Sequence, residues 1–298
     1  MGRRSSQVYQ EADRMRNILL FFYFMVFSSS TFSQAFYTII DDDVTSNKSI
    51  QKIKELSDKK GIKITFAPIV RNLVSNKNIC DSLLSYQEQG FHICNHSYSH
   101  SPSVWREMNL QMIEDELKLS HDILDSLGFV DHDYFVYPYG KFQDGIRDSI
   151  IFFVSNYFKL AFDSRGRYNR FDAGQFNKYY SHRFAFRSHN DWLAVKLIID
   201  EAIEKDGWIV FLTHSGRSDF DVIKLERIIN YCQSKGLRAF TVHEAYQKIV
   251  QFKESFDESQ DFNLWDEISD VLYMHRFSLI FIGGLLIVLI IVIKKLYF

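Results

Sequence analysis

Three adjacent carboxylates, Asp41, Asp42 and Asp43, directly follow the apolar run Phe36–Ile40. Neighbouring carboxylates repel one another, so this arrangement is costly unless a cation or a shared proton lies among them. Carboxylates also act as ligands for divalent metals and as general bases. The segment therefore indicates a catalytic or metal-binding cluster, with a solvated acidic turn as the alternative.

Two histidines four residues apart, His96 and His100, follow the strand-like segment Phe91–Asn95. Residues at positions i and i+4 share one face of a helical turn, where two imidazoles can hold one metal ion. A hydrolytic zinc site uses about three nitrogen or oxygen ligands from the protein and keeps one position open. Two histidines and a carboxylate from a neighbouring strand end satisfy that requirement.

A further histidine, His214, follows Trp208–Thr213, whose sequence is typical of a buried strand. Histidine titrates near neutral pH, so one at a strand end is well placed for proton transfer, although a lone histidine is also commonly structural. The other histidines have simpler interpretations, because burying an unpaired polar group costs free energy. His92 is interpreted as a strand residue that faces a helix, and solvated positions are expected for His121, His132, His189 and His243.

Strand-like and helix-like segments alternate around these residues. The predicted strands are Phe36–Ile40, Ile62–Ala67, Phe91–Asn95, Tyr134–Tyr137, Phe158–Phe162, His182–Phe186, Trp208–Thr213 and Leu237–Thr241. Helices are predicted at Lys48–Lys60, Glu107–Leu127 and Val222–Lys235, each followed by a glycine that suits a left-handed C-cap.

This alternation predicts an α/β fold in which helices cover a parallel sheet. The number of units favours a distorted (β/α) barrel of about seven to eight units. In such a barrel the chemistry lies at the carboxyl ends of the strands, where the carboxylates and histidines described above are found.

The first 35 residues have the pattern of a secretory signal peptide. The apolar run Ile18–Phe27 follows Arg14 and Arg16 and precedes small polar residues, which predicts cleavage after Ala35. An uncleaved membrane anchor is the alternative.

The other end of the chain predicts a transmembrane helix at 277–293, which contains no charged residue. Lys294 and Lys295 follow it and mark a cytoplasmic tail at 294–298, so the central part of the chain is expected on the extracytoplasmic side. An acidic tether is predicted at 253–276, because Lys253–Asp270 holds one lysine and seven acidic residues.

The overall formal charge of −2 comes with no basic block, which argues against a nucleic-acid partner. The charge is also unevenly distributed. The tether segment Lys253–Asp270 carries −6, whereas Phe36–Phe252 carries −1. A nearly neutral core fits an uncharged substrate better than a polyanion.

Four segments in this order, IIDDD, HSYSH, YPYG and FLTH, resemble the motifs of the polysaccharide deacetylases of the NodB-homology type, carbohydrate esterase family 4. The family pattern is an apolar pair followed by Asp-Asp-Gly, then HSxxH or HTxxH, then RxPY, then LxH. The resemblance extends across most of residues 36–252, which we interpret as the deacetylase domain.

The resemblance implies a role for each matching residue. It assigns Asp41 as the general base, His214 as the general acid and the backbone N–H of Tyr139 as an oxyanion donor. It assigns the divalent metal, zinc first and cobalt, nickel or manganese as alternatives, to Asp42, His96 and His100.

The sequence departs from the family pattern at two positions. Asp43 replaces the glycine, and Val136 stands where the arginine of RxPY is usual. Arg183 or Arg165 is a conjectural substitute for that arginine, and Asp163 is a conjectural partner that orients His214.

The implied activity is metal-dependent removal of N-acetyl groups from N-acetylated sugars of a cell-surface or cell-wall polysaccharide. The implied partners are that glycan and, through the C-terminal helix, the membrane. Two alternatives stay open: a deacylase or deformylase of a lipid-linked sugar, and a catalytically silent carbohydrate-binding homologue.

Overall fold

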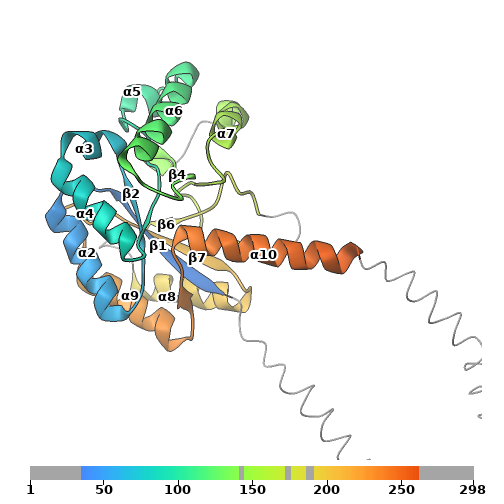
Figure 1. Ribbon diagram of the computed structural model, residues 1–298. Coiled ribbons are helices and arrows are strands. Elements are labelled where there is room, and N and C mark those ends of the chain that lie inside the picture. The colour runs from blue at the N-terminus through green and yellow to red at the C-terminus, as the bar shows by residue number, and fades with distance from the viewer. Residues whose placement is uncertain (1–34, 141–143, 172–175, 186–190, 262–298) are drawn as a thin grey trace, which may run out of the picture. The chain divides into compact units, whose positions relative to one another are not determined.

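Parallel strands surrounded by helices form the described part of the chain (Figure 1). The computed structural model describes residues 35–140, 144–171, 176–185 and 191–261, with side chains through residue 251. The chain divides into two compact units, residues 1–245 and residues 246–298.

The main sheet has the strand order β3-β2-β1-β7-β6, and every pairing in it is parallel. A sixth strand, β8, pairs with the first residues of β1. Their bounds are β1 Phe36–Asp43, β2 Thr65–Pro68, β3 His92–Ile93, β6 Phe184–Ala185, β7 Trp208–Thr213 and β8 Arg238–Ala239.

Two further strands, β4 (Tyr134–Val136) and β5 (Leu160–Phe162), pair in parallel and connect the two edges of the main sheet. The backbone N–H of Asn95, just after β3, donates to the carbonyl of Tyr134 at 2.8 Å. On the other side, the N–H of Ser181, just before β6, donates to the carbonyl of Ala161 at 2.9 Å. The pairing therefore runs around a ring of short strands, and the predicted α/β class with a parallel sheet is confirmed.

Helices fill the connections between strands. Their bounds are α2 Asn47–Lys60, α3 Val70–Ser75, α4 Lys77–Glu88, α5 Pro102–Trp105, α6 Leu110–Leu127, α7 Arg147–Ser155, α8 Trp192–Glu204, α9 Val222–Ser234 and α10 Val242–Asp261. Gly61 and Gly128 are the predicted left-handed caps of α2 and α6, with φ of 63° and 86°.

The predicted helix Glu107–Leu127 begins too early. Met108 has φ 56°, which interrupts the helical backbone, and the side chain of Asn109 accepts from the N–H of Met112 as the N-cap of α6. The short helix α5 precedes this break.

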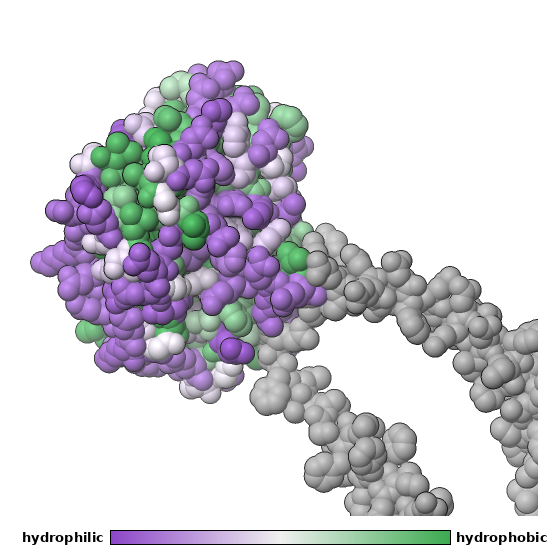
Figure 2. Space-filling model, viewed as in Figure 1, coloured by the Kyte–Doolittle hydropathy of each residue, from purple (hydrophilic) through white to green (hydrophobic). Residues whose placement is uncertain are grey.

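Two apolar clusters hold the domain together. One packs β1, β2 and β7 against α2, α4, α8 and α9, and it includes the predicted α2 residues Ile50, Ile53 and Leu56. The other packs α5, α6 and α7 against β4, where Trp105 and Phe135 lie with ring centroids 5.6 Å apart. On the surface that Figure 2 shows, polar side chains predominate, and apolar ones form smaller groups among them.

Several predictions for the chain ends lie outside the described residues. These are the signal peptide up to residue 34, the transmembrane helix at 277–293 and the tail at 294–298. Among the described residues, no helix has the length and apolar character needed to cross a membrane. Helix α10 continues to Asp261 through the predicted boundary at residue 252.

His92 in β3 is buried, and its Nε2 donates to the carbonyl of Asp131 at 2.8 Å. Burial lowers the pKa of His92 from 6.5 to about 4. Below pH 6.5 the unfolded chain therefore binds a proton that the folded chain does not, so the free energy of unfolding falls as the pH falls.

We predict that His92→Gln makes the free energy of unfolding less sensitive to acid, by about 2 kcal/mol between pH 7 and pH 5. Urea unfolding of both proteins at the two pH values measures the difference. An equal loss of stability on acidification in wild type and variant would contradict this account of His92.

Candidate active site

A cavity of about 450 Å³ contains most of the predicted site residues. It opens at the carboxyl ends of β1 and β7, as expected for a parallel barrel. Its lining includes Asp42, Asp43, His96, His100, Tyr139, Arg183 and His214. Asp41 and Asp163 are buried and do not contribute to this lining.

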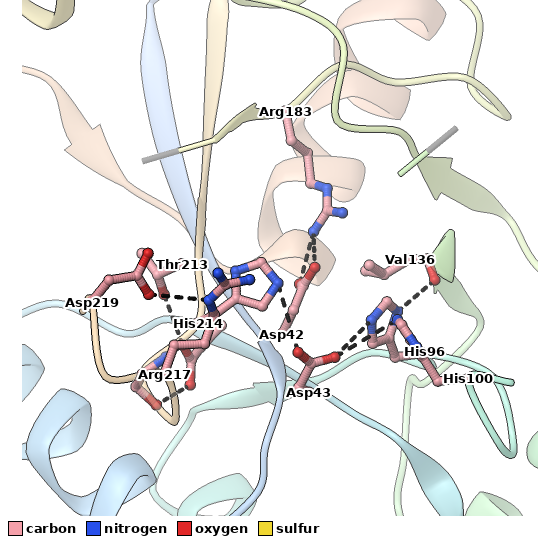
Figure 3. A network of polar contacts seen from close by, with 12 residues as sticks. Asp42, Asp43, His96, His100, Val136, Arg183, Thr213, His214, Arg217 and Asp219 are labelled. Atoms are coloured by element: carbon pink, nitrogen blue, oxygen red, sulfur yellow. Dashed lines mark hydrogen bonds and ion pairs between the residues drawn. The ribbon is translucent and has the colours of Figure 1, made fainter. Parts of the chain in front are cut away.

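Asp43 is the carboxylate that lies against the two histidines (Figure 3). Its Oδ1 is 3.5 Å from Nε2 of His96 and 3.8 Å from Nε2 of His100. One ligand atom from each of the three residues lies within 4.8 Å of the others. The oxygen Oδ2 of Asp43 is 3.8 Å from Nε2 of His214. Asp43 therefore stands between the histidine pair and His214.

The ring of His96 is fixed by a backbone carbonyl. Its Nδ1 is 2.8 Å from the carbonyl oxygen of Val136, and because a carbonyl only accepts, Nδ1 carries the proton. Nε2 then presents its lone pair toward Asp43 and the cavity, which is how metal-bound histidines are commonly oriented. Val136, which lacks the arginine side chain of the family pattern, contributes through its main chain.

The segment from His96 to His100 is a loop rather than the helical turn that the spacing suggested. Ser97 and His100 have φ of 62° and 53°, and the two imidazole centroids lie 4.8 Å apart. Glu116 of α6 secures the loop, since it accepts from the N–H of Ser99 at 2.8 Å and from the Ser99 hydroxyl. Glu116 has no distinctive sequence signal, because it lies among other polar residues of a helix.

Asp42 is buried and paired with Arg183, the residue just before β6. Nη1 of Arg183 donates to the two carboxylate oxygens of Asp42 at 2.8 and 2.9 Å, and Nε of Arg183 donates to the carbonyl of Asp163 at 2.8 Å. Arg183 has 0% of its surface exposed. Such a pair fixes the direction of the Asp42 carboxylate.

Asp41 points away from the cavity. Its carboxylate accepts from the hydroxyl of Thr213 at 2.8 Å, from the N–H of Ser215 at 2.7 Å and from the hydroxyl of Ser215 at 2.6 Å. Thr213 lies opposite Asp41 in the β1/β7 register. Asp41 thus holds the two residues that flank His214.

The structure places a different aspartate beside the two histidines from the one predicted. In an extended strand Asp41 and Asp43 would share one face and Asp42 the other. The backbone instead turns at the end of β1, with φ 70° at Asp43 and 46° at Val44, so Asp42 and Asp43 both face the cavity. The group with His96 and His100 therefore contains Asp43 rather than Asp42.

Aligning the two aspartates of the family motif one residue later in the chain also changes which residue occupies its glycine position. With Asp42 and Asp43 as the two aspartates, Val44 stands at the glycine position, and its positive φ is one that glycine adopts without strain. Left-handed residues cluster at functional sites, where the surrounding structure supports the strain. Five of the eight such non-glycine residues in the described ranges belong to this region: Asp43, Val44, Ser97, His100 and Tyr139.

Asp163 does not contact His214 as conjectured. Its Oδ1 lies 3.1 Å from Nδ1 of His182, and that hydrogen bond raises the pKa of His182. Its backbone carbonyl instead holds Arg183. The backbone carbonyl of Asp163 therefore helps to position Arg183, which pairs with Asp42. Asp41 accepts hydrogen bonds from Thr213 and Ser215, the residues on either side of His214.

Tyr139 lies beside the histidines at φ 60°, between Pro138 and Gly140. Its ring centroid is 4.5 Å from that of His100, and its hydroxyl donates to the carbonyl of His100 at 3.1 Å. A side chain at Gly140 would collide with Ser164, since a Cβ atom there would lie 1.8 Å from the Ser164 hydroxyl. Close packing thus fixes the turn that carries Tyr139.

Burial and charge shift the pKa values in the cavity. Burial raises the pKa of Asp41 to about 7 despite the hydrogen bonds from Ser215 and Thr213. Burial would also raise the pKa of Asp43, but when His96 is doubly protonated, its hydrogen bond and charge lower the pKa of Asp43 below its usual value. Burial lowers the pKa of His100 to about 4 and that of His214 below its usual value.

The residues fit a divalent metal. Two imidazole nitrogens and one carboxylate oxygen form the donor set, and the Val136 carbonyl already holds His96 in the tautomer that leaves Nε2 free to bind. Nitrogen and oxygen ligands of this kind suit zinc and its neighbours among the transition metals. The fold and the cluster therefore define an α/β domain whose cavity residues fit a divalent metal.

Residues 31–151 match the family model described as Polysaccharide deacetylase. This match confirms the predicted resemblance to that family over residues 31–151. The segment contains Asp42, Asp43, His96 and His100, whereas Arg183 and His214 lie beyond it. A comparison with curated proteins finds no match.

The chain is similar to several solved structures. A family 4 acetyl xylan esterase from Clostridium thermocellum, in complex with a cobalt ion, is 16% identical with a TM-score of 0.50, covering 74% of this chain and 92% of its own. The Xyl-CE4 domain of a xylanase from the hindgut metagenome of Trinervitermes trinervoides has 19% identity and a TM-score of 0.49, covering 72% and 90%. The peptidoglycan deacetylase PdaC from Bacillus subtilis, in mutant form, has 14% identity and a TM-score of 0.49, covering 76% and 97%.

We predict that Arg183→Met lowers the free energy of unfolding by about 3–5 kcal/mol, because Asp42 is left as a buried charge without its partner. The double variant Asp42→Asn/Arg183→Met removes both charges and is expected to recover most of that loss. Urea unfolding measures both effects.

The matched control is Arg165→Met, an exposed arginine two residues from Asp163, with an expected change within about 0.5 kcal/mol. If the double variant is as unstable as Arg183→Met alone, the ion pair is not what stabilises this region.

Proposed function

We propose that this protein is a metal-dependent hydrolase that removes N-acetyl groups from N-acetylated sugars of a cell-surface or cell-wall polysaccharide. The observation that carries the proposal is one cavity that joins the group of Asp43, His96 and His100 to Asp42 and His214. The family match over residues 31–151 supports the deacetylase class.

Asp43, His96 and His100 are proposed to hold the divalent metal, with zinc as the first candidate and cobalt, nickel or manganese as alternatives. When bound there, the metal supplies Lewis-acid chemistry: it lowers the pKa of a water molecule and polarises the amide oxygen.

Asp42 is proposed as the general base in place of Asp41. It lines the cavity next to Asp43, and its pair with Arg183 fixes its carboxylate in position to take a proton from the attacking water. Asp41 has 0% exposure, and its oxygens are occupied by Thr213 and Ser215, so it cannot reach a substrate.

His214 is proposed as the general acid. It lies across Asp43 from the histidine pair, so that Asp42 takes the proton on one side of the amide and His214 gives one to the departing amine. The lowered pKa of His214, caused first by burial, makes its protonated form a stronger acid. The backbone N–H of Tyr139 is proposed to donate to the oxyanion.

The two departures from the family pattern, Val136 and Asp43, favoured a catalytically silent homologue. Against that alternative, Arg183 pairs with Asp42, and Asp43 lies beside His96 and His100. A deacylase of a lipid-linked sugar would use the same residues, and activity on lipid-linked but not on free oligosaccharide would favour it.

We predict that the full chain releases acetate from N-acetylglucosamine oligomers and that a chelator abolishes the release. Asp42→Asn is expected to bind zinc as well as wild type does but to lose at least about 100-fold in turnover, since a general base contributes about that much or more. Asp43→Asn is expected to lose zinc binding. Acetate release and metal content measure the two effects.

The matched control is Asp41→Asn, which changes the third neighbouring carboxylate and is expected to keep zinc binding. Turnover that survives complete removal of metal would overturn the proposed mechanism. If Asp42→Asn loses zinc and Asp43→Asn retains it, the assignment of the two aspartates is wrong.

We also propose that the domain is exported and anchored to the membrane, with residues 1–35 as signal peptide, 253–276 as tether and 277–293 as transmembrane helix. The apolar runs and flanking charges support this arrangement. A protease added to intact cells is expected to digest the domain, and truncation before residue 277 is expected to release it. A protected domain would contradict the proposed orientation.

A further inference from the structure

A second group of metal-ligand side chains lies at the end of α6, outside the active-site cavity. His121 and Asp125 are one helical turn apart on α6, and His132 lies in the segment that leads into β4. One ligand atom from each lies within 4.8 Å of the others. The cavity described above is lined by other residues.

The geometry of this group is close to that of a metal site. Nε2 of His132 is 2.8 Å from Oδ1 of Asp125, and Nδ1 of His121 is 3.5 Å from Oδ2 of the same carboxylate. The two imidazole centroids are 4.8 Å apart. Ligands at zinc distances in a tetrahedral site lie roughly 3.3–3.5 Å from one another. Small side-chain rotations therefore suffice to bring the three onto one ion.

The group is anchored on one side and open on the other. His132 is 3% exposed, which corrects the expectation that it is solvated, whereas the side chain of Asp125 is 62% exposed. The rings of Tyr157 and Phe158 lie 6.1 and 5.8 Å from that of His121. Solvent can therefore reach the carboxylate and supply the remaining ligands.

The local charge favours a cation. Residues 121–133 contain four aspartates and two histidines but no lysine or arginine. Asp122 and Asp133 are paired with Lys118 and Lys159. In the described ranges the ion pairs of Asp125 are with the two histidines. Its carboxylate therefore lies between the two imidazoles as an oxygen ligand for a cation.

We propose that His121, Asp125 and His132 form a second site for a zinc-type divalent ion. The bound ion would join the end of α6 to the segment entering β4, the strand whose Val136 carbonyl holds His96. Imidazole and carboxylate ligands in this number match zinc, with solvent completing the coordination. This proposal does not depend on the proposed deacetylase activity.

The second site is expected to bind zinc more weakly than the first. The ring nitrogen Nδ1 of His132 is buried without a hydrogen-bond partner among the described contacts, whereas Nδ1 of His96 has the Val136 carbonyl. Loss of such an outer partner costs about 10–100-fold in metal affinity. We therefore expect two phases of binding separated by roughly that factor.

Calorimetric titration of the tag-free full chain with zinc chloride tests the proposal. Wild type is expected to bind two equivalents, His121→Gln/Asp125→Asn only the tighter one, and His100→Gln only the weaker one. The variant carrying all three changes is expected to bind none. Asp122→Asn, a carboxylate of the same helix, is the matched control and is expected to bind two.

Thermal unfolding gives a second readout, since a ligand of the folded state raises the melting temperature. Zinc is expected to stabilise His100→Gln but not the variant with all three changes. If His121→Gln/Asp125→Asn still binds two equivalents, or if wild type binds only one that His100→Gln removes, the second site does not exist. If His100→Gln still binds two, the active-site assignment fails. In that case the second site stands if His121→Gln/Asp125→Asn binds one equivalent fewer than wild type and is refuted if it binds as many.

Discussion

At the end of β1 the backbone leaves the extended conformation, with φ 70° at Asp43 and 46° at Val44. Without this turn, successive carboxylates would point to opposite faces of the sheet. With it, Asp42 and Asp43 both reach the cavity, while Asp41 faces β7. Three adjacent charges that would otherwise repel one another are thus separated into three environments.

Each environment compensates its carboxylate in a different way. Asp41 accepts hydrogen bonds from Thr213 and Ser215, Asp42 pairs with Arg183, and Asp43 lies among histidines. These partners come from the end of β7 and the segment after it, from the residue just before β6 and from the loop after β3. The ring of strands is therefore a requirement of the site, because it brings distant segments to one end of β1.

Much of the fold could be predicted from the sequence. Strand β7 was predicted with its observed bounds, and β1 and β4 were predicted to within a few residues, because their apolar patterns are local. The break at Met108 was missed, since a left-handed backbone at a methionine has no clear sequence signal. The loop between His96 and His100 was missed for a similar reason, because its shape depends on Glu116 of α6.

The members of the candidate site could be predicted, but their grouping could not. Motif order identified the histidines and the run of aspartates, yet adjacent identical residues allow the register of a motif to slip by one. Only the backbone turn decides which aspartate meets His96. Arg183 could only be conjectured, because it lies 141 residues from Asp42 in the sequence and no local pattern links the two.

The central claim is that Asp43, and not its neighbours, binds the metal together with His96 and His100. A crystal structure of the zinc-loaded protein, with anomalous data collected on both sides of the zinc edge, tests it most directly. The account predicts an anomalous peak bonded to Asp43, His96 and His100, with Asp42 still paired to Arg183. A peak bonded to Asp41 or Asp42 in place of Asp43, or no peak in this cavity, would contradict it.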